Sequence, residues 1–299
     1  MVKLVDALDS KSSGLRSVRV RVPPPALFIG LHLPTIFCPT ILAQRKILRN
    51  SILVVLSTIA AGLVYFVFGQ GYWAIAGLML LTVATRFRQK TIDLGKAFQM
   101  VLTFLILSVG INELGITYPY SLILILAGLV MVIFFEGPEW KDLYFGPGKT
   151  GSNFRLSLFV MLALVVLSCS WNYLTFSPEH NPVPVAWPLD ALLVIGVGFA
   201  AYMAIMEEII FRSFLLQKLN TAAGEVAAVV GQGFFYGLMH YKVGAPSGIH
   251  GIVLASLSGL ALGFLVKKSN SIYLAMLVHF VLTLAVFVEL AILGKIEGN

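Results

Sequence analysis

Charged side chains are scarce in this chain of 299 residues. Only 12% of the residues are Asp, Glu, Lys or Arg, and 58% are hydrophobic, whereas roughly a quarter of the residues in a soluble protein are charged. Cysteine is also nearly absent, because only Cys38 and Cys169 occur. A disulfide framework and a cysteine-based zinc site are therefore not expected. The composition predicts an integral, multi-pass membrane protein.

The net charge of +7 does not come from a basic stripe with interleaved aromatic residues, so nucleic-acid binding is not predicted. The Lys and Arg residues instead form short clusters between apolar runs. After position 44, fourteen of the sixteen positive residues fall in links on one side of the expected topology. By the positive-inside rule that side is cytoplasmic, and it holds the N-terminus and the mouth of the site described below.

From Arg45 onward, apolar runs alternate with short polar links. Each run approaches the roughly 20 residues that a transmembrane helix needs. The sequence therefore predicts an all-α, polytopic transmembrane helical bundle with eight or nine spans. Nine are counted if the short second run crosses the membrane, and eight if it is interfacial. The expected spans are 51–69, 72–86, 97–114, 118–135, 154–175, 187–210, 223–241, 249–266 and 271–293.

Three parts of the chain are distinguished. Residues 1–44 carry scattered basic residues and three consecutive prolines but no signal-peptide pattern, so we expect a disordered or artefactual N-terminal extension. Residues 45–150 are interpreted as scaffold helices, and a link rich in Gly, Pro and charge ends them. Residues 151–299 contain the convergent polar side chains and are interpreted as the functional core.

The segment EEIIFR places Glu207, Glu208 and Arg212 directly after a long apolar run. Charges near membrane depth are costly and are functional by default. Residues four apart share a helix face, so Glu208 and Arg212 are expected to pair. Glu207 projects about 100° away and is interpreted as a general base for water. The alternative interpretation is an interfacial charge cluster that ends a transmembrane helix.

Two lone histidines, His240 and His279, lie in the apolar segments GFFYGLMHY and SIYLAMLVHFVLTLAVF. Either one alone is typical of a hydrogen bond between packed helices, but together with the glutamates they could activate water and stabilise an oxyanion. Two Glu and two His could also ligate zinc, although we predict a metal-free site without a cofactor. The expected topology puts His240 about 25 Å along its helix. The residues then meet only if helices tilt strongly or residues 213–226 lie along the cytoplasmic surface.

Three segments in this order, EEIIFRSFLL, GFFYGLMH and SGLALGFLVKKSNSIYLAMLVHFVLT, resemble the motifs of the CAAX protease and bacteriocin-processing family, also called the Abi family, of intramembrane glutamic endopeptidases. The resemblance covers about residues 154–293. The family motifs EExxxR, FxxxH and HxxxN fall on Glu207, Glu208 and Arg212, on Tyr236 and His240, and on His279 and Thr283. The resemblance implies a helical membrane core, a cavity open to the cytoplasm, and water activated by the first glutamate and the first histidine. The last pair is implied to stabilise the oxyanion.

Two positions depart from the family pattern. Tyr236 replaces Phe and adds a hydroxyl group, while Thr283 replaces Asn and offers one donor where an amide offers two. Loss of one oxyanion donor costs on the order of a hundredfold in rate. Tyr236 and Phe211 are expected to contact the substrate. His250 is interpreted as a structural or loop residue.

The predicted function is hydrolysis of a peptide bond in a membrane-associated protein or peptide, including a prenylated one. Thr283 favours an alternative, a catalytically weak membrane scaffold or partner-binding protein that retains the fold. A proton-coupled transporter is a third reading, because intramembrane carboxylates also serve proton relays. The sequence shows no inverted pair of broken helices of the kind that transporters use. The expected partners are the substrate and the lipid bilayer, and the sequence does not indicate an oligomeric state.

Overall fold

A computed structural model describes residues 39–137, 140–177, 183 and 186–297. Within these residues every regular element is a helix and no strand occurs, which confirms the all-α prediction. The extension expected at residues 1–44 lies mostly outside the described part, which begins with the first helix at Pro39.

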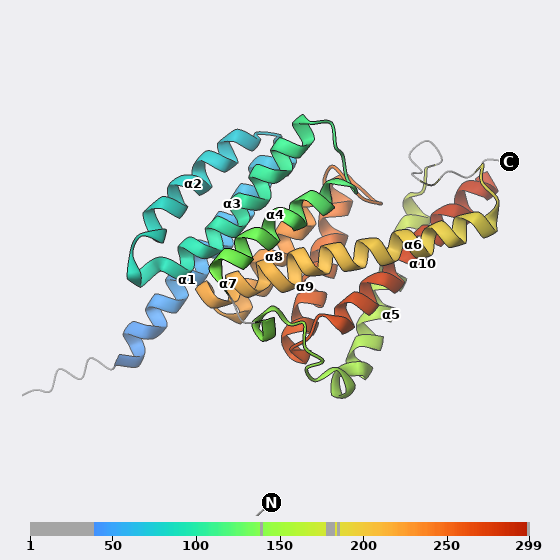
Figure 1. Ribbon diagram of the computed structural model, residues 1–299. Helices are drawn as coiled ribbons and strands as arrows, with labels where there is room; N and C mark the ends of the chain where they lie inside the picture. The colour runs from blue at the N-terminus through green and yellow to red at the C-terminus, as the bar shows by residue number, and fades with distance from the viewer. Residues whose placement is uncertain (1–38, 138–139, 178–182, 184–185, 298–299) are drawn as a thin grey trace, which may run out of the picture. The chain divides into compact units, whose positions relative to one another are not determined.

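All nine apolar runs recognised in the sequence lie on helices of the structure (Figure 1). The α-helices are α1 (Pro39–Gly62), α2 (Gly71–Arg86), α3 (Ile92–Glu113), α4 (Ser121–Glu136), α5 (Thr150–Thr175), α6 (Leu189–Glu207), α7 (Leu216–Ala223), α8 (Glu225–Met239), α9 (Gly248–Ser269) and α10 (Tyr273–Glu297). In the described part of the chain, two segments are π-helical, η1 (Leu63–Val67) and η5 (Glu208–Leu215), and two are short 3₁₀ helices, η2 (Gln89–Thr91) and η3 (Trp140–Leu143).

Six helical segments of the described chain are long and apolar enough to cross a membrane, so the expected count of eight or nine spans is not confirmed. They are Lys46–Val67, Ile92–Glu113, Thr150–Thr175, Leu189–Ala223, Gly248–Ser269 and Tyr273–Ile296. The apolar helices α4 and α8 have only 16 and 15 residues. At about 1.5 Å per residue they are roughly 24 and 22 Å long, which is less than the ~30 Å hydrocarbon core.

The sixth span does not end near residue 210 as the sequence suggested. The helix continues from α6 through η5 into α7, and the combined segment has 35 residues, Leu189–Ala223. It continues because an apolar face, with Phe214 and Leu219 buried on it, packs against the core. Glu207 therefore lies near the middle of this helix, and the interpretation as a charge cluster at a helix end is wrong.

The chain reverses at Gly224, whose φ of 85° suits a residue without a side chain. Helices α7 and α8 pack together on either side of this turn. Glu207 precedes Gly224 by 17 residues and His240 follows it by 16, so both lie a similar distance from the turn. The expected mismatch in depth disappears because the sixth helix is longer than the sequence suggested.

Small residues bring α8 and α9 together, and Figure 1 shows the two helices side by side. A methyl group on Gly259 would lie 2.9 Å from the Cα atom of Gly233. At the same crossing the side-chain amide of Gln232 donates a hydrogen bond to the carbonyl oxygen of Gly259, at 2.8 Å. The GxxxG pattern of Gly259 and Gly263 therefore serves close helix packing.

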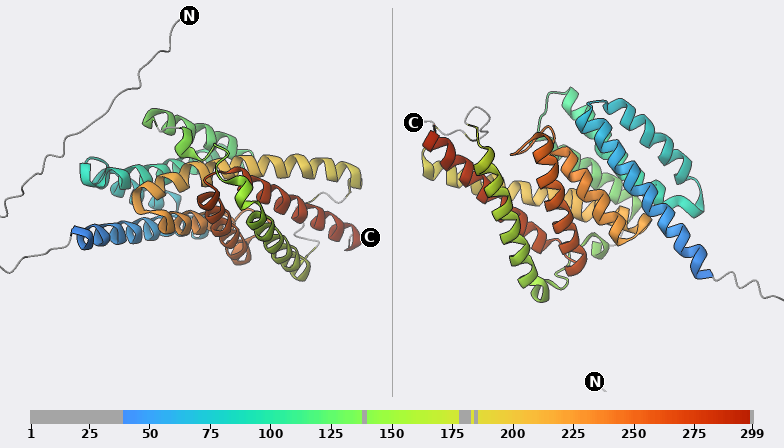
Figure 2. Two further views of the ribbon diagram at one scale, coloured as in Figure 1. Left: turned by 90° about the horizontal axis from the view of Figure 1, so that it is seen from below. Right: turned by 180° about the vertical axis from the view of Figure 1, so that it is seen from behind.

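An aromatic cluster joins the N-terminal helices to the C-terminal ones. The ring of Phe104 on α3 lies 5.7 Å from that of Phe211 and 5.4 Å from that of Phe235, and Phe66 lies 5.6 Å from Phe235. Figure 2 shows α1, in blue, next to α2 and α3, in teal. Helix α10 packs along α6 and against α5. Both predicted parts, 45–150 and 151–299, thus contribute to one core.

We expect Gly259→Ala to destabilise the protein by about 1–3 kcal/mol, because the added methyl group overpacks a backbone contact. The matched control is Gly198→Ala, where an added methyl group meets nothing within 4 Å. This control should leave stability unchanged or raise it by up to ~1 kcal/mol, since alanine favours a helix. Melting temperatures in detergent measure both effects. Equal melting temperatures for the two variants would contradict the close packing.

Candidate functional site

A cavity of about 470 Å³ lies between α6, α8, α9 and α10. Five of the residues expected at the site line it: Glu207, Tyr236, His240, His279 and Thr283. They come from α6, α10 and the end of α8. The rest of the wall is mainly apolar, with side chains such as Phe199, Leu254, Leu282 and Phe287.

Glu207 is only 1% exposed, and each of its carboxylate oxygens accepts a hydrogen bond from a tyrosine. The Tyr236 hydroxyl donates to Oε2 at 2.7 Å, and the Tyr118 hydroxyl donates to Oε1 at 3.0 Å. His279 Nε2 lies 3.6 Å from Oε2, too far for a direct hydrogen bond. The carboxylate is thus held at both oxygens, and each oxygen keeps a second lone pair.

Glu208 and Arg212 pair as expected, behind the cavity wall. Both are fully buried, and Arg212 Nη1 lies 3.1 Å from Glu208 Oε1. The same oxygen accepts a hydrogen bond from His279 Nδ1 at 2.8 Å. The backbone here is the π-helical segment η5, a geometry frequent at functional sites. Glu208 therefore connects η5 to α10 and fixes the orientation of the His279 ring.

The guanidinium of Arg212 makes its other close contact with an aromatic face. Its Cζ atom lies 4.3 Å from the centre of the Tyr236 ring, a cation–π distance. Its contact with Glu208 is an ion pair and not a well-aligned hydrogen bond. Tyr236 is held from two directions, by this cation and by the carboxylate of Glu207.

His240 follows the last residue of α8 and has one ring nitrogen engaged. Its Nδ1 atom lies 3.0 Å from the carbonyl oxygen of Tyr236. Because a carbonyl oxygen only accepts, Nδ1 carries the proton and Nε2 keeps a lone pair. The ring also packs on that of Tyr236, with 4.6 Å between centres. His240 is therefore oriented as an acceptor at the cavity.

Tyr118 was not recognised in the sequence. It lies in the connection between α3 and α4, 89 residues before its partner Glu207. Burial raises the pKa of its hydroxyl well above the ordinary value, and the neighbouring carboxylate of Glu207 adds to the shift, so the hydroxyl stays a neutral donor. No local pattern could have revealed this residue, because the contact depends on how distant helices pack.

Thr283 lies one turn after His279 on α10 and lines the cavity. Phe211 does not line it. Its side chain is fully buried, in the aromatic cluster with Phe104 and Phe235. Its position is explained by core packing and gives no support to the expected substrate contact.

His250 is exposed outside this wall and packs on Trp171, with 4.9 Å between ring centres. No group of three or more His, Cys, Asp and Glu within the described residues is arranged to hold a metal ion. The metal-free site stays a prediction.

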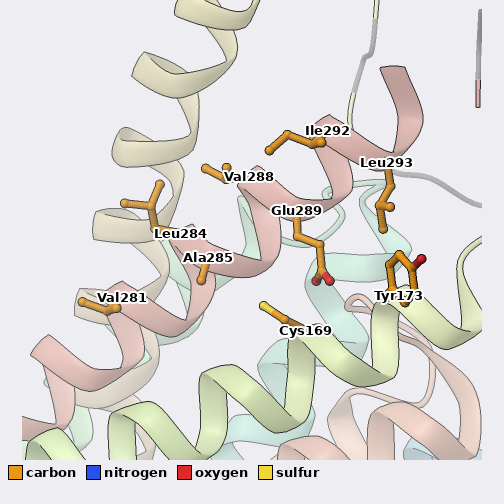
Figure 3. A pocket seen from close by; sticks show the side chains of 9 residues that line it. All are labelled: Cys169, Tyr173, Val281, Leu284, Ala285, Val288, Glu289, Ile292 and Leu293. Atoms are coloured by element: carbon orange, nitrogen blue, oxygen red, sulfur yellow. The ribbon is translucent and has the colours of Figure 1, made fainter. Parts of the chain in front are cut away.

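A second hollow, of about 580 Å³, lies between α5 and α10 (Figure 3). Its wall is almost entirely apolar, and Figure 3 shows Glu289 turned toward Cys169. Glu289 also accepts a hydrogen bond from Asn172 at 3.4 Å. This hollow is larger than the first cavity, but none of the residues expected at the site line it. It therefore lacks the cluster of polar side chains that the first cavity has.

A comparison with protein families gives one match to the chain. Residues 188–285 match the family described as Type II CAAX prenyl endopeptidase Rce1-like. The matched region extends from the start of α6 into α10 and contains all eight expected site residues, which confirms the family resemblance. No curated protein and no solved structure shows a significant match. The family match and the six apolar helices together indicate an integral membrane protein with a region similar to CAAX-type proteases.

We expect Arg212→Met to destabilise the protein by about 3–5 kcal/mol, because it leaves the buried Glu208 without its cation. The double variant Glu208→Gln, Arg212→Met should recover more than half of this loss, since no unpaired charge remains. Unfolding in mixed detergents measures both. A double variant that is less stable than Arg212→Met would contradict the pairing.

Proposed function

We propose that the protein is an intramembrane endopeptidase in which Glu207 activates the hydrolytic water. The supporting observation is that Glu207, His240 and His279, which come from three different parts of the chain, line one cavity. A carboxylate, a histidine acceptor and a second histidine around one enclosed space are the groups that water activation and oxyanion stabilisation need.

In the proposed reaction, a water molecule binds between Glu207 and His240. Each oxygen of Glu207 has a lone pair left after its tyrosine contact, and His240 Nε2 is a further acceptor. Glu207 takes one proton from the water, and the resulting hydroxide attacks the carbonyl carbon of the scissile peptide bond. When the C–N bond breaks, the carboxyl group of Glu207 returns that proton to the leaving amine.

The developing oxyanion is stabilised by His279 and Thr283. Glu208 accepts a hydrogen bond from the Nδ1–H group of His279 and so fixes the ring, which donates from Nε2 to the oxyanion when that nitrogen carries a proton. Thr283 adds a hydroxyl donor from the next turn of α10. Arg212 neutralises Glu208 and holds it in place. In this scheme Glu208 and Arg212 act through His279 and do not touch the substrate.

The cavity wall supports a substrate with an apolar group. Phe199, Leu254, Leu282 and Phe287 surround the polar cluster and suit a membrane-associated peptide, including a prenylated one. The positive-inside rule puts the links rich in Lys and Arg on the cytoplasmic side. The loop residues that line the cavity, Tyr118, Pro119 and residues 244–246, lie in links on the opposite side, so they do not support the cytoplasmic mouth expected from the sequence. The proposed reaction uses no metal or cofactor.

A second candidate function follows from Thr283. A single hydroxyl donor at this position favours a catalytically weak membrane protein that retains the protease fold and binds partners. The two candidates differ in whether the purified protein cleaves any peptide.

We expect Glu207→Gln to reduce peptide cleavage by about a thousandfold or more, since it removes the general base. Cleavage is measured with reconstituted protein and a library of prenylated and unprenylated peptides. Glu225→Gln is the control, because this glutamate is 58% exposed at the start of α8 and lies far from the cavity wall. If the wild-type protein cleaves no peptide in the library, the endopeptidase proposal fails and the scaffold function is favoured.

We expect Thr283→Asn to raise the cleavage rate by about tenfold or more, because the amide supplies a stronger oxyanion donor than the hydroxyl. Thr283→Val, which keeps the shape but removes the hydroxyl, should lower the rate by a similar factor. The measurement is kcat with a fixed peptide. An unchanged kcat in both variants would show that this position does not contact the oxyanion.

A further inference from the structure

Glu207 receives one of its two hydrogen bonds from outside the region that matches the protease family. Tyr236 is within residues 188–285, but Tyr118 precedes them and belongs to the part expected to be only a scaffold. The N-terminal part of the chain therefore contributes a polar group to the cavity, and Tyr118 is among the residues that line it.

The two tyrosines hold different oxygens of the carboxylate. With Tyr236 on Oε2 alone, the carboxylate could still rotate about its last side-chain bond. The hydrogen bond from Tyr118 to Oε1 removes that freedom and leaves one lone pair on each oxygen for a water molecule. A base held at both oxygens presents its remaining lone pairs in fixed directions.

Tyr118 is itself fixed from α6, the helix that carries Glu207. The Tyr202 hydroxyl donates to the carbonyl oxygen of Pro119 at 2.8 Å, which ties the α3–α4 connection to α6. The Tyr118 hydroxyl also lies 3.6 Å from the sulfur of Met203. Two contacts besides the one to Glu207 thus hold the α3–α4 connection against α6, and loss of either one leaves the other in place.

Tyr118 also separates the cavity from a neighbouring hollow of about 320 Å³. That hollow has a polar rim that includes Asn112, Glu113 and Lys242. Tyr118 lines both hollows, and its hydroxyl is hydrogen-bonded to Glu207.

We propose that Tyr118 is a positioning residue for Glu207, supplied by the N-terminal helices. The proposal rests on the proposed function of Glu207 as the base. Its role is to orient the carboxylate toward the water, and it takes no proton itself.

The test compares Tyr118→Phe with two controls. The phenylalanine keeps the ring and its packing but removes the donor, so we expect kcat to fall by about tenfold to a hundredfold, as misplaced catalytic groups do. KM should stay within about twofold, because an interaction that acts in the transition state changes kcat and not uniform binding. Tyr120→Phe, in the same connection but 70% exposed, should leave both constants unchanged.

Tyr202→Phe is the second control. It removes the hydrogen bond to Pro119 and loosens the same connection without touching Glu207. If loosening of the connection explained the effect, Tyr202→Phe would lower kcat as much as Tyr118→Phe does. That result, with equal melting temperatures, would overturn the positioning role. Tyr118→Met, which also lacks a donor, replaces Tyr118→Phe if the latter does not fold, and the same fall in kcat is expected.

A second readout does not depend on peptidase activity. A hydrophobic carbodiimide reacts with carboxyl groups in apolar sites, and mass spectrometry locates the adduct. Without the hydrogen bond from Tyr118, Oε1 of Glu207 has no donor against it and is free to attack the carbodiimide, so Glu207 should be labelled at least about threefold faster at a fixed pH than in the wild type. Tyr120→Phe should be labelled at the wild-type rate.

The two readouts separate the two proposals. If the wild-type protein cleaves no peptide but Tyr118→Phe accelerates labelling of Glu207, the endopeptidase proposal fails and the contact that positions the carboxylate is upheld. If the wild type is active and Tyr118→Phe changes neither kcat nor labelling, the positioning role is overturned and the proposed function stands.

Discussion

The burial of ionisable side chains is the constraint on which this structure depends. A buried charge without a partner costs several kcal/mol. Each buried charged side chain therefore needs an ion-pair or hydrogen-bond partner within the helix bundle. A single oxygen of Glu208 meets this need for two residues, because it contacts both Arg212 and His279. The contact fixes η5 against α10, and the neighbouring Glu207 is placed at the cavity as a consequence.

Helix packing brings the rest of the polar cluster to the same depth. The turn at Gly224 pairs α7 with α8, and the glycines at the crossing of α8 and α9 allow the two backbones to approach. Aromatic side chains from α3 and η1 fill the space on the far side of η5 and α8. The same helices therefore carry the polar site on one face and the apolar core on the other. A substitution in the core that moves one of these helices also moves the residues of the site.

The sequence predicted the helices and most of the polar cluster well. Each apolar run recognised in the sequence lies on a helix, and the motif spacing identified five residues that line one cavity. The span count is not confirmed, because α2, α4 and α8 carry apolar runs but have only 15 or 16 residues, and composition does not set where a helix ends. The end of the sixth helix was misjudged because charged residues look like a helix end when their buried partners are unknown. Tyr118 escaped notice because nothing near it in the sequence indicates its partner.

The π-helical geometry of η5 has a consequence for the spacing of the EExxxR motif. A π-helix takes more residues per turn than an α-helix, so it changes the angular phase between the helix before it and the helix after it. On the α6 side, the phase points Glu207 into the cavity, and on the α7 side it points Leu216 and Leu219 into the core. The length of the motif therefore sets the rotation of α7 relative to α6. Loss of one residue within it would rotate the face that carries Glu207 relative to the face that packs in the core.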